Sequence, residues 1–361
     1  MNRKHFACPV LLIVTLYATS FAQTNPQNNF KLFTADNHKI QYTGRIDFSN
    51  PKKPKFWASG VYITAKFKGA TCEVIINDEE LWGKSHNYLE IAIDDSEPFK
   101  VQTTGKTNTI KIAGDVSKTE HIVTICKNTE SGIGYLEFIG IRCDKLLSPP
   151  AKPTRKIEFI GNSITCGTGS DHSNIACDKG EWYDQHNAYL SYGPTTARLL
   201  NAQWHLTSVS GIGLIHSCCN MDVTMPMVFD KINQRDDTLK WNFKNYQPDV
   251  VTITLGQNDG IQDSTTFCST YVTFIKDIRK VYPNAFIAAL TSPMADSVLT
   301  AKMKNYLTGI TDYVHTTGDK NVGKYFYSRS FNSGCGGHPD LKEHQLIAAE
   351  LTRYLKEKLG W

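Results

Sequence analysis

The sequence predicts two domains, an all-β sandwich or jelly roll followed by an α/β domain with a five-stranded parallel sheet flanked by helices. Three observations support this division: short β-branched runs in residues 23–146, a proline-rich stretch in residues 147–155, and alternating strand and helix patterns in residues 156–361. A chain of 361 residues, of which 40% are hydrophobic, is long enough to bury a core in each domain.

The amino terminus has the features of a secretion signal. Arg3 and Lys4 form a basic start, residues 10–17 are apolar, and small residues precede a cleavage point after Ala22. We therefore expect residues 1–22 to be a signal peptide cleaved near Ala22, and the protein to be secreted or periplasmic. The apolar run is too short to span a bilayer, and no other stretch of the sequence is suited to do so.

The charge of the chain points to no particular partner. A formal net charge of +4 is spread over the whole sequence, and Lys and Arg form no run of five or more. A nucleic-acid surface would need a basic cluster, so we expect no nucleic-acid partner. We also expect a monomer without a membrane span.

The ten cysteines favour no particular pairing. Removal of the signal peptide removes Cys8, and an odd number such as the remaining nine leaves at least one cysteine free. None of them shows the C-x-x-C spacing of a zinc or redox site. We expect several to be buried as small apolar residues, and we do not expect the adjacent Cys218 and Cys219 to bond to each other.

The first domain is predicted from a series of short strands. Alternating or β-branched runs are separated by Gly, Asn, Asp and Pro, and no amphipathic helix of useful length interrupts them. A two-sheet sandwich or jelly roll is the natural way to bury so many half-apolar strands. The predicted strands cover residues 61–65, 72–76, 88–93, 109–112 and 121–125.

Three prolines separate this pattern from the next one. Pro149, Pro150 and Pro153 fix an extended backbone and remove donors that a sheet or a helix would need. Residues 147–155 are therefore expected to be the linker between the domains.

Beyond the linker, strand patterns alternate with helix patterns. Five such repeats indicate a parallel sheet covered by helices on both faces, in which ligands bind beyond the carboxyl ends of the strands. The expected strands are residues 157–160, 204–209, 250–255, 286–290 and 324–328, and the expected helices are residues 194–200, 271–281, 299–314 and 339–359.

Four segments that follow these strands carry residues suited to acyl transfer. Ser163 follows the first strand, Gly211 the second and Asn258 the third, while His338 precedes the last helix. Taken alone, each has a plain structural use as a turn, a packing position or a helix cap. Because the sheet gathers these loops at one edge, we expect Ser163 to be the nucleophile and His338 its general base. The backbone N–H groups of Ser163 and Gly211 and the amide of Asn258 would form the oxyanion hole, and no cofactor is expected.

This order of motifs, Gly-x-Ser, Gly, Gly-x-Asn-Asp and then His-Pro before a terminal helix, resembles the SGNH (GDSL-type) hydrolases. The nucleophile elbow of other α/β hydrolases is Gly-x-Ser-x-Gly, and Thr165 stands at its last position here. Nearly the whole chain is similar to carbohydrate esterase family 2 through "YTGRIDF" at residues 42–48, "ASGVYITAKFKG" at 58–69, the proline linker and "GNSITCGTG" at 161–169.

The resemblance implies a two-domain acetyl esterase that removes O-acetyl groups from plant polysaccharides such as xylan and glucomannan. Its partner would then be an acetylated polysaccharide or oligosaccharide. Two other hypotheses stay open. One is an esterase, lipase or thioesterase for a different acyl group, and the other is a carbohydrate-binding protein that has lost catalysis.

Two departures from the family pattern concern Asn162 and the acid partner of His338. Asn162 stands where the family name has an aspartate. Many SGNH enzymes have an aspartate three residues before the histidine, and Cys335 occupies that position here. A thiol cannot stabilise an imidazolium as a carboxylate does, so either a backbone carbonyl or an acid from elsewhere in the chain would orient His338. Asp340 is the nearest carboxylate in sequence, but we expect it in the first helical turn, where it offsets the helix dipole.

The helix expected after His338 bears on the protonation of this residue. We expect Pro339 at the first helical position, and the positive potential of a helix start would keep the imidazole neutral. Metal binding is the competing use of His338. Only Cys335 and His344 stand near it at ligand spacing, so no metal is expected.

Contacts to the substrate are less visible in the sequence. Phe229 is a candidate aromatic residue of the cleft, with packing in the core as its alternative use. Residues 170–186 follow the nucleophile directly and are polar and irregular. They would form either one wall of the cleft or a plain surface insertion.

Overall fold

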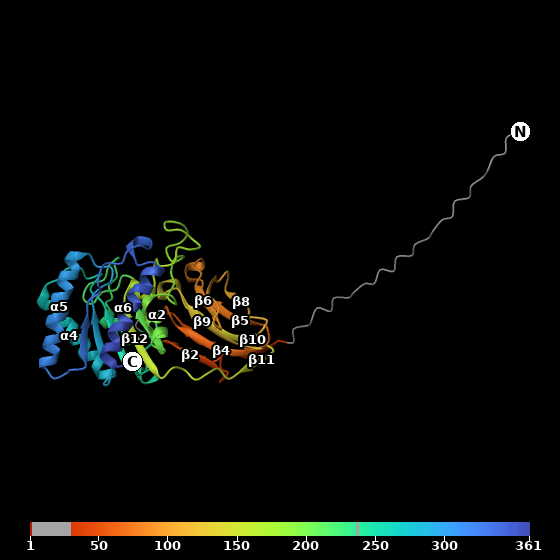
Figure 1. Ribbon diagram of the computed structural model, residues 1–361, viewed down its shortest axis with the longest axis horizontal. Coiled ribbons are helices and arrows are strands. Elements are labelled where there is room, and N and C mark those ends of the chain that lie inside the picture. The colour runs from red at the N-terminus through yellow and green to blue at the C-terminus, as the bar shows by residue number, and fades with distance from the viewer. Residues whose placement is uncertain (2–29, 236–237) are drawn as a thin grey trace.

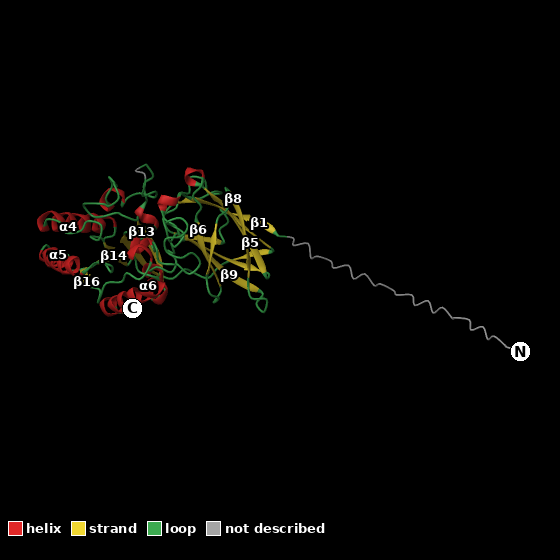
Figure 2. Cartoon of the chain, turned by 90° about the horizontal axis from the view of Figure 1, so that it is seen from above, coloured by secondary structure: helices red, strands yellow, loops and turns green. Residues whose placement is uncertain are grey.

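The computed structural model describes Met1, residues 30–235 and residues 238–361. The predicted signal peptide therefore lies outside the described residues, apart from Met1. Figure 1 shows a β-rich part next to a part in which helices surround a sheet. Figure 2 shows the same division from above, with the sandwich strands on one side and the long helices on the other. The predicted fold class is confirmed.

Two antiparallel sheets form the first domain. One contains β1 (Lys31–Thr34), β10 (Leu136–Cys143), β5 (Thr71–Asp78) and β8 (Thr107–Ala113) in that order, with β3 (Lys55–Phe56) paired to β10. The other contains β11 (Lys145–Leu147), β4 (Tyr62–Lys68), β9 (Glu120–Lys127), β6 (Tyr88–Ile93) and β7 (Phe99–Gln102), with β2 (Ile40–Thr43) paired to β4. Each strand predicted from the sequence overlaps one of these.

The sheets bury apolar side chains between them because their strands alternate between an inner and an outer face. Along β8 the side chains of Asn108, Ile110 and Ile112 are buried, while those between them are exposed. Both sheets contribute to one core, whose members include Val74, Leu89, Ile91, Ile125 and Phe138.

The second domain contains one sheet of five parallel strands. In spatial order they are β13 (Ala202–Ser208), β12 (Arg155–Gly161), β14 (Val250–Thr254), β15 (Phe286–Leu290) and β16 (Val322–Tyr325). The register pairs Gly161 with Ser208 on one side and with Thr254 on the other. These three strands therefore end at the same level, and the loops after them begin side by side.

Helices cover both faces of this sheet. They are α1 (Ser163–Cys166), α2 (Tyr192–Leu199), α3 (Met225–Val228), α4 (Ser264–Val281), α5 (Ser297–Thr316) and α6 (Leu341–Leu359). The 3-10 turns in the described residues are η1 (Leu81–Gly83), η2 (Ser131–Ile133), η3 (Phe243–Asn245) and η4 (Cys335–Gly337). Helices α4 and α5 share a core with Ile253 and Ile287, and α2 and α6 share another with Phe159 and Leu290. No helix among the described residues is long and apolar enough to cross a membrane.

Aspartate caps set where the long helices begin. The side chains of Asp263, Asp296 and Asp340 accept backbone N–H groups in the first turns of α4, α5 and α6. The expectation of Pro339 at the first helical position is wrong, because the cap falls on Asp340 and Pro339 precedes it.

The two domains share a buried interface. Tyr62 of β4 stacks on Trp204 of β13 with ring centroids 4.0 Å apart, and the Trp204 indole donates to the Gly60 carbonyl over 2.9 Å. Arg45 forms an ion pair with Glu158 of β12 over 2.9 Å, and both side chains are fully buried. The packing therefore continues from one domain into the other, although residues 148–154, which join them in sequence, contain no helix or strand.

Candidate active site

The candidate nucleophile lies on the turn between β12 and α1. Strand β12 ends at Gly161, and Ser163 is the first residue of α1. Asn162 caps this helix, since its side-chain oxygen accepts the backbone N–H of Ile164 over 3.3 Å. Amide and carboxylate oxygens both serve as such acceptors, so the asparagine does not disturb the turn that carries Ser163 to the edge of the sheet.

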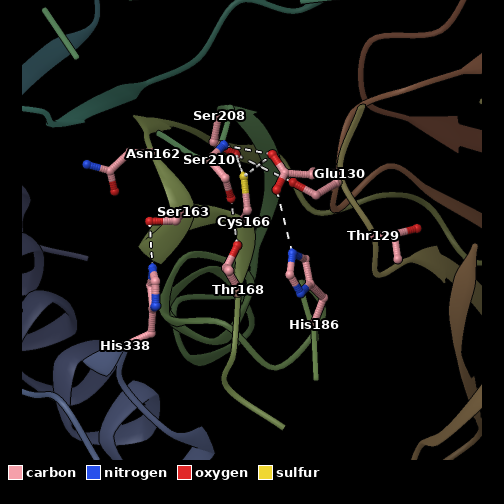
Figure 3. Close-up of polar contacts among 12 residues, drawn as sticks. Thr129, Glu130, Asn162, Ser163, Cys166, Thr168, His186, Ser208, Ser210 and His338 are labelled. Carbon is pink, nitrogen blue, oxygen red and sulfur yellow. Dashed lines mark hydrogen bonds and ion pairs between the residues drawn. The ribbon is translucent and has the colours of Figure 1, made fainter. Parts of the chain in front are cut away.

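The structure brings Ser163 and His338 together. The Oγ of Ser163 lies 2.9 Å from Nε2 of His338 (Figure 3). On the other side of the ring, Nδ1 lies 3.2 Å from the backbone carbonyl oxygen of Cys335, which only accepts, so Nδ1 carries the proton. Nε2 is then free to accept the hydroxyl proton of Ser163, as a general base must.

A backbone carbonyl, rather than a carboxylate, orients the imidazole. Of the two alternatives that the sequence leaves open, the carbonyl of Cys335 is the one in contact. Within the described parts of the chain, no carboxylate forms a hydrogen bond with His338. Asp340 accepts the backbone N–H of Glu343 over 2.7 Å at the start of α6 and does not serve the histidine.

Cys335 is half of a disulfide and not a thiol. It is bonded to Cys177, from which it is separated by 158 residues in sequence. Its backbone N–H also donates to the Gly169 carbonyl over 2.8 Å. The loop that carries His338 is thus joined to the segment that follows the nucleophile, and nothing in the cysteine spacing indicated this pair.

The remaining cysteines in the described residues divide into a second disulfide and free thiols. The expectation that Cys218 and Cys219 do not pair is wrong, because they are bonded to each other. The expectation of buried free cysteines is confirmed for several others, namely Cys72, Cys126, Cys143 and Cys166.

Burial keeps the imidazole of His338 neutral, the form that can accept a proton. Removal from water lowers the pKa of its imidazole below 6.5, although the hydrogen bond to the Cys335 carbonyl and the charge of Glu130 oppose this shift. The cause expected from the sequence, a helix start at the histidine, is wrong because α6 begins only at Leu341.

The residues weighed as metal partners of His338 have other contacts. Cys335 is held in the disulfide, and Nδ1 of His344 accepts the backbone N–H of Tyr192 over 3.1 Å. Where the structure describes the chain, no group of three or more His, Cys, Asp or Glu side chains is placed to hold a metal ion.

The candidate oxyanion donors flank the nucleophile because of the strand order. Gly211 follows β13 and Asn258 follows β14, the two strands on either side of β12. No acceptor among the described residues takes the backbone N–H of Ser163 or of Gly211. Asn258 donates one amide N–H to the Ile212 carbonyl over 2.8 Å, which leaves its second N–H for a ligand. Three unpaired donors of this kind suit a tetrahedral oxyanion.

Gly211 occupies a position where any other residue would be strained. Its φ is +83°, a region that L side chains rarely adopt. A Cβ there would lie 2.9 Å from the Sγ of Cys218 and 3.1 Å from the Sδ of Met221. Glycine therefore allows the backbone N–H to reach this place without strain.

Proteins of known family resemble this chain in both domains. Residues 42–150 match the family model described as Carbohydrate esterase 2 N-terminal, and residues 159–320 match the GDSL-like Lipase/Acylhydrolase family. A solved structure of a family two carbohydrate esterase from Clostridium thermocellum, in complex with cellohexaose, is similar with a TM-score of 0.81. It is 32% identical in sequence, and the match covers 89% of this chain and 99% of the other. The chain belongs to carbohydrate esterase family 2.

Two further relatives agree with this membership. Cellulase/esterase CelE of Acetivibrio thermocellus is 33% identical over 340 residues, and the match covers 90% of this chain but only 40% of CelE. An acetylxylan esterase / glucomannan deacetylase of Cellvibrio japonicus is 25% identical, with 98% of this chain and 99% of the relative covered. The interpretation of the chain as a family 2 carbohydrate esterase is confirmed.

Asp259 holds the loop that follows Gly211, a candidate oxyanion donor of this family 2 esterase. It is 3% exposed, and its carboxylate accepts the backbone N–H groups of residues 214–216 over distances between 2.7 and 3.0 Å. These residues follow Gly211 closely in the chain. The only signal for this role in the sequence is the place of Asp259 directly after Asn258.

Phe229 is not a residue of the cleft, so its assignment as a substrate contact is wrong. Its side chain is buried in the core of the α/β domain. The ring packs against Phe243 and Phe274 with centroid distances of 5.2 and 5.4 Å. Core packing, its alternative use, is what the structure shows.

Residues 170–186 form a bridge between the sandwich domain and the loop of the histidine. Lys100 of β7 forms an ion pair with Asp171 over 3.2 Å, and both side chains are almost fully buried. Cys177 anchors the middle of the segment to Cys335 through the disulfide. The segment is therefore more than a plain surface insertion.

Proposed function

We propose that this family 2 esterase removes O-acetyl groups from plant polysaccharides through an acetyl-serine intermediate on Ser163. The observation that carries the proposal is the distance of 2.9 Å between Oγ of Ser163 and Nε2 of His338. The substrate class is supported by the relatives, since one is an acetylxylan esterase / glucomannan deacetylase and another was solved with cellohexaose.

In the first half of the reaction, Oγ of Ser163 attacks the acetyl carbonyl carbon while Nε2 of His338 takes the hydroxyl proton. The negative oxygen of the tetrahedral intermediate accepts the N–H groups of Ser163 and Gly211 and the amide of Asn258. Each such donor stabilises the transition state by about 3 kcal/mol. The bond to the sugar oxygen then breaks, and His338 returns its proton to that oxygen.

In the second half, water attacks the acetyl group on Ser163 and gives a proton to His338. The same three donors receive the new oxyanion. Its collapse breaks the bond to Oγ, releases acetic acid, which ionises to acetate, and returns the proton to Ser163. Throughout both halves Nδ1 of His338 keeps its proton and donates it to the Cys335 carbonyl, and this hydrogen bond keeps the ring in one orientation.

Export of the protein is part of the same proposal. The disulfides Cys177–Cys335 and Cys218–Cys219 belong to oxidising compartments, where secreted and periplasmic proteins fold. This agrees with a signal peptide over residues 1–22, followed by a sandwich domain over 23–146, a linker over 147–155 and a catalytic domain over 156–361.

The test is acetate release from acetylated xylan and from acetylated glucomannan. We expect Ser163→Ala to lower kcat by at least about 10⁴-fold. Ser269→Ala, at an exposed position of α4, is the matched control and should leave kcat unchanged. Full activity of Ser163→Ala contradicts the proposal. Faster hydrolysis of octanoyl than of acetyl esters would favour the longer-chain esterase instead, and binding of the polysaccharide without acetate release would favour the binding protein.

A further inference from the structure

The sandwich domain places a buried carboxylate beside the catalytic loops. Glu130 follows β9 and directly precedes η2, and its side chain is 2% exposed. Figure 3 shows it reaching from the sandwich domain toward Ser210, Cys166 and His186. None of the proposed reaction steps uses Glu130 directly.

The contacts of Glu130 explain how a charge is tolerated at this place. Its Oε2 accepts the backbone N–H of Ser210 over 2.7 Å and lies 3.8 Å from the Cys166 thiol, while Oε1 lies 3.5 Å from Nε2 of His186. Burial alone would raise the pKa of Glu130, but the contacts with His186 and Ser210 hold it below its usual value. Glu130 is therefore an ionised acceptor, and hydrogen bonds to charged acceptors are the stronger ones.

The backbone beneath this carboxylate is itself fixed. The side chain of Lys127, which is fully buried, donates to the Thr129 carbonyl over 2.7 Å and to the Glu130 carbonyl over 3.1 Å. These bonds close the turn between β9 and η2. The sandwich domain therefore presents the Glu130 side chain from a rigid base.

Ser210, the partner of Glu130, is the residue next to a candidate oxyanion donor. Its N–H is bound by Glu130, its hydroxyl oxygen lies 2.8 Å from Oγ1 of Thr168, and the next residue is Gly211. Thr168 in turn donates its backbone N–H to the Ser163 carbonyl over 3.0 Å. A continuous series of hydrogen bonds thus leads from Glu130 through Ser210 and Thr168 to the carbonyl of Ser163.

We propose that Glu130 is a positioning residue, contributed by the sandwich domain, that holds the N–H of Gly211 where the oxyanion forms. The inference rests on the proposed function, because that function assigns Gly211 to the oxyanion hole. It gives the sandwich domain a part in the reaction that does not require contact with the substrate.

Two substitutions in the full chain test the acceptor oxygen of Glu130 separately from the volume of its side chain. Glu130→Met occupies a similar volume without an acceptor, and we expect kcat for an acetyl aryl ester to fall about tenfold or more. KM should change by less than about twofold, since the oxyanion exists only after attack. Glu130→Gln keeps an oxygen that can accept the Ser210 N–H, and we expect its kcat to lie within about threefold of the unmodified protein.

Glu158→Gln is the matched control. Glu158 is also a fully buried carboxylate that bonds across the domain interface, to Arg45, but it lies inside β12 and away from the loops at its end. We expect this substitution to lower the melting temperature and to change kcat by less than about twofold.

An unchanged kcat in folded Glu130→Met overturns the inference, and so does a Glu130→Gln protein that is as impaired as Glu130→Met. A kcat loss in Glu158→Gln as large as that in Glu130→Met also overturns it. If Glu130→Met does not fold, Glu130→Asp replaces it, because it keeps the charge but withdraws the oxygen from Ser210; an unchanged kcat there is equally decisive. Inactivity of the unmodified protein, or activity of Ser163→Ala, would count against the proposed function instead.

Discussion

Replacing Cys177 by alanine removes the disulfide that joins residues 170–186 to the loop carrying His338. The bond links residues 158 apart in sequence, so most of the catalytic domain lies inside the loop that it closes. Loop-closure entropy for that length corresponds to about 5 kcal/mol of stability. At about 2–4 °C per kcal/mol, Cys177→Ala should lower the melting temperature by roughly 10–20 °C.

Activity at 25 °C should change far less than stability. Without the disulfide, the N–H of Cys335 still donates to the Gly169 carbonyl over 2.8 Å, and the N–H of Gly334 still donates to the His338 carbonyl over 2.7 Å. The carbonyl that orients His338 belongs to the backbone of Cys335, which the substitution leaves in place. We therefore expect kcat within about threefold of the unmodified protein, or about 0.7 kcal/mol of barrier.

Thermal unfolding by circular dichroism and hydrolysis of an acetyl aryl ester at 25 °C measure the two effects separately. Cys335→Ala and the double variant are the controls, because all three break the same bond and their effects should coincide rather than add. A kcat lowered about a hundredfold with an unchanged melting temperature would refute the reasoning, since the disulfide would then act on the geometry of His338 and not on the unfolded chain.

Three further outcomes are expected. On the acid side, kcat/KM should decline with an apparent pKa below 6.5, because neutral His338 is the base and burial lowers its pKa. An apparent pKa above 6.5 would contradict this assignment. Burial lowers the pKa of His344 from 6.5 to about 3, so between these two pH values the unfolded chain binds a proton that the folded chain does not. As the pH falls through this window, the free energy of unfolding should therefore decrease by about 1.4 kcal/mol per pH unit. His344→Asn, which can still accept the Tyr192 N–H, should make urea-measured stability less dependent on pH, and an identical slope would argue against a neutral buried imidazole. Gly211→Ala should lower kcat about a hundredfold, because the new Cβ displaces the oxyanion donor; full activity in this variant would exclude Gly211 from the oxyanion hole.

The fold is predictable because its two kinds of strand differ in periodicity. Burial alternates residue by residue along β8, whereas β14 is buried throughout, as sandwich strands and central parallel strands require. Helix starts are less visible. The helix pattern predicts a start at residue 271, but α4 begins at Ser264, because the cap at Asp263 sets its start and its first turn carries Ser and Thr rather than apolar residues.

Parallel topology also predicts which loops meet, but not what supports them. The proximity of Ser163 and His338 follows from loops that gather at one edge of the sheet. The support of His338 comes from a backbone carbonyl, and every residue has one, so no side-chain pattern marks it. Cys335 stands where many SGNH enzymes have an acid. Its disulfide partner, Cys177, is too distant in sequence for the cysteine spacing to indicate the bond.

In the proposed dyad, a backbone carbonyl stands where a serine triad has a carboxylate. A triad aspartate both fixes the imidazole ring and stabilises the imidazolium. Here the Cys335 carbonyl fixes the ring because it accepts the N–H of Nδ1. Burial lowers the pKa of His338, so the base is neutral before attack. The hydrogen bond to the Cys335 carbonyl opposes this shift and favours the imidazolium once the proton has moved, so we infer that the carbonyl contributes to both functions of the missing acid.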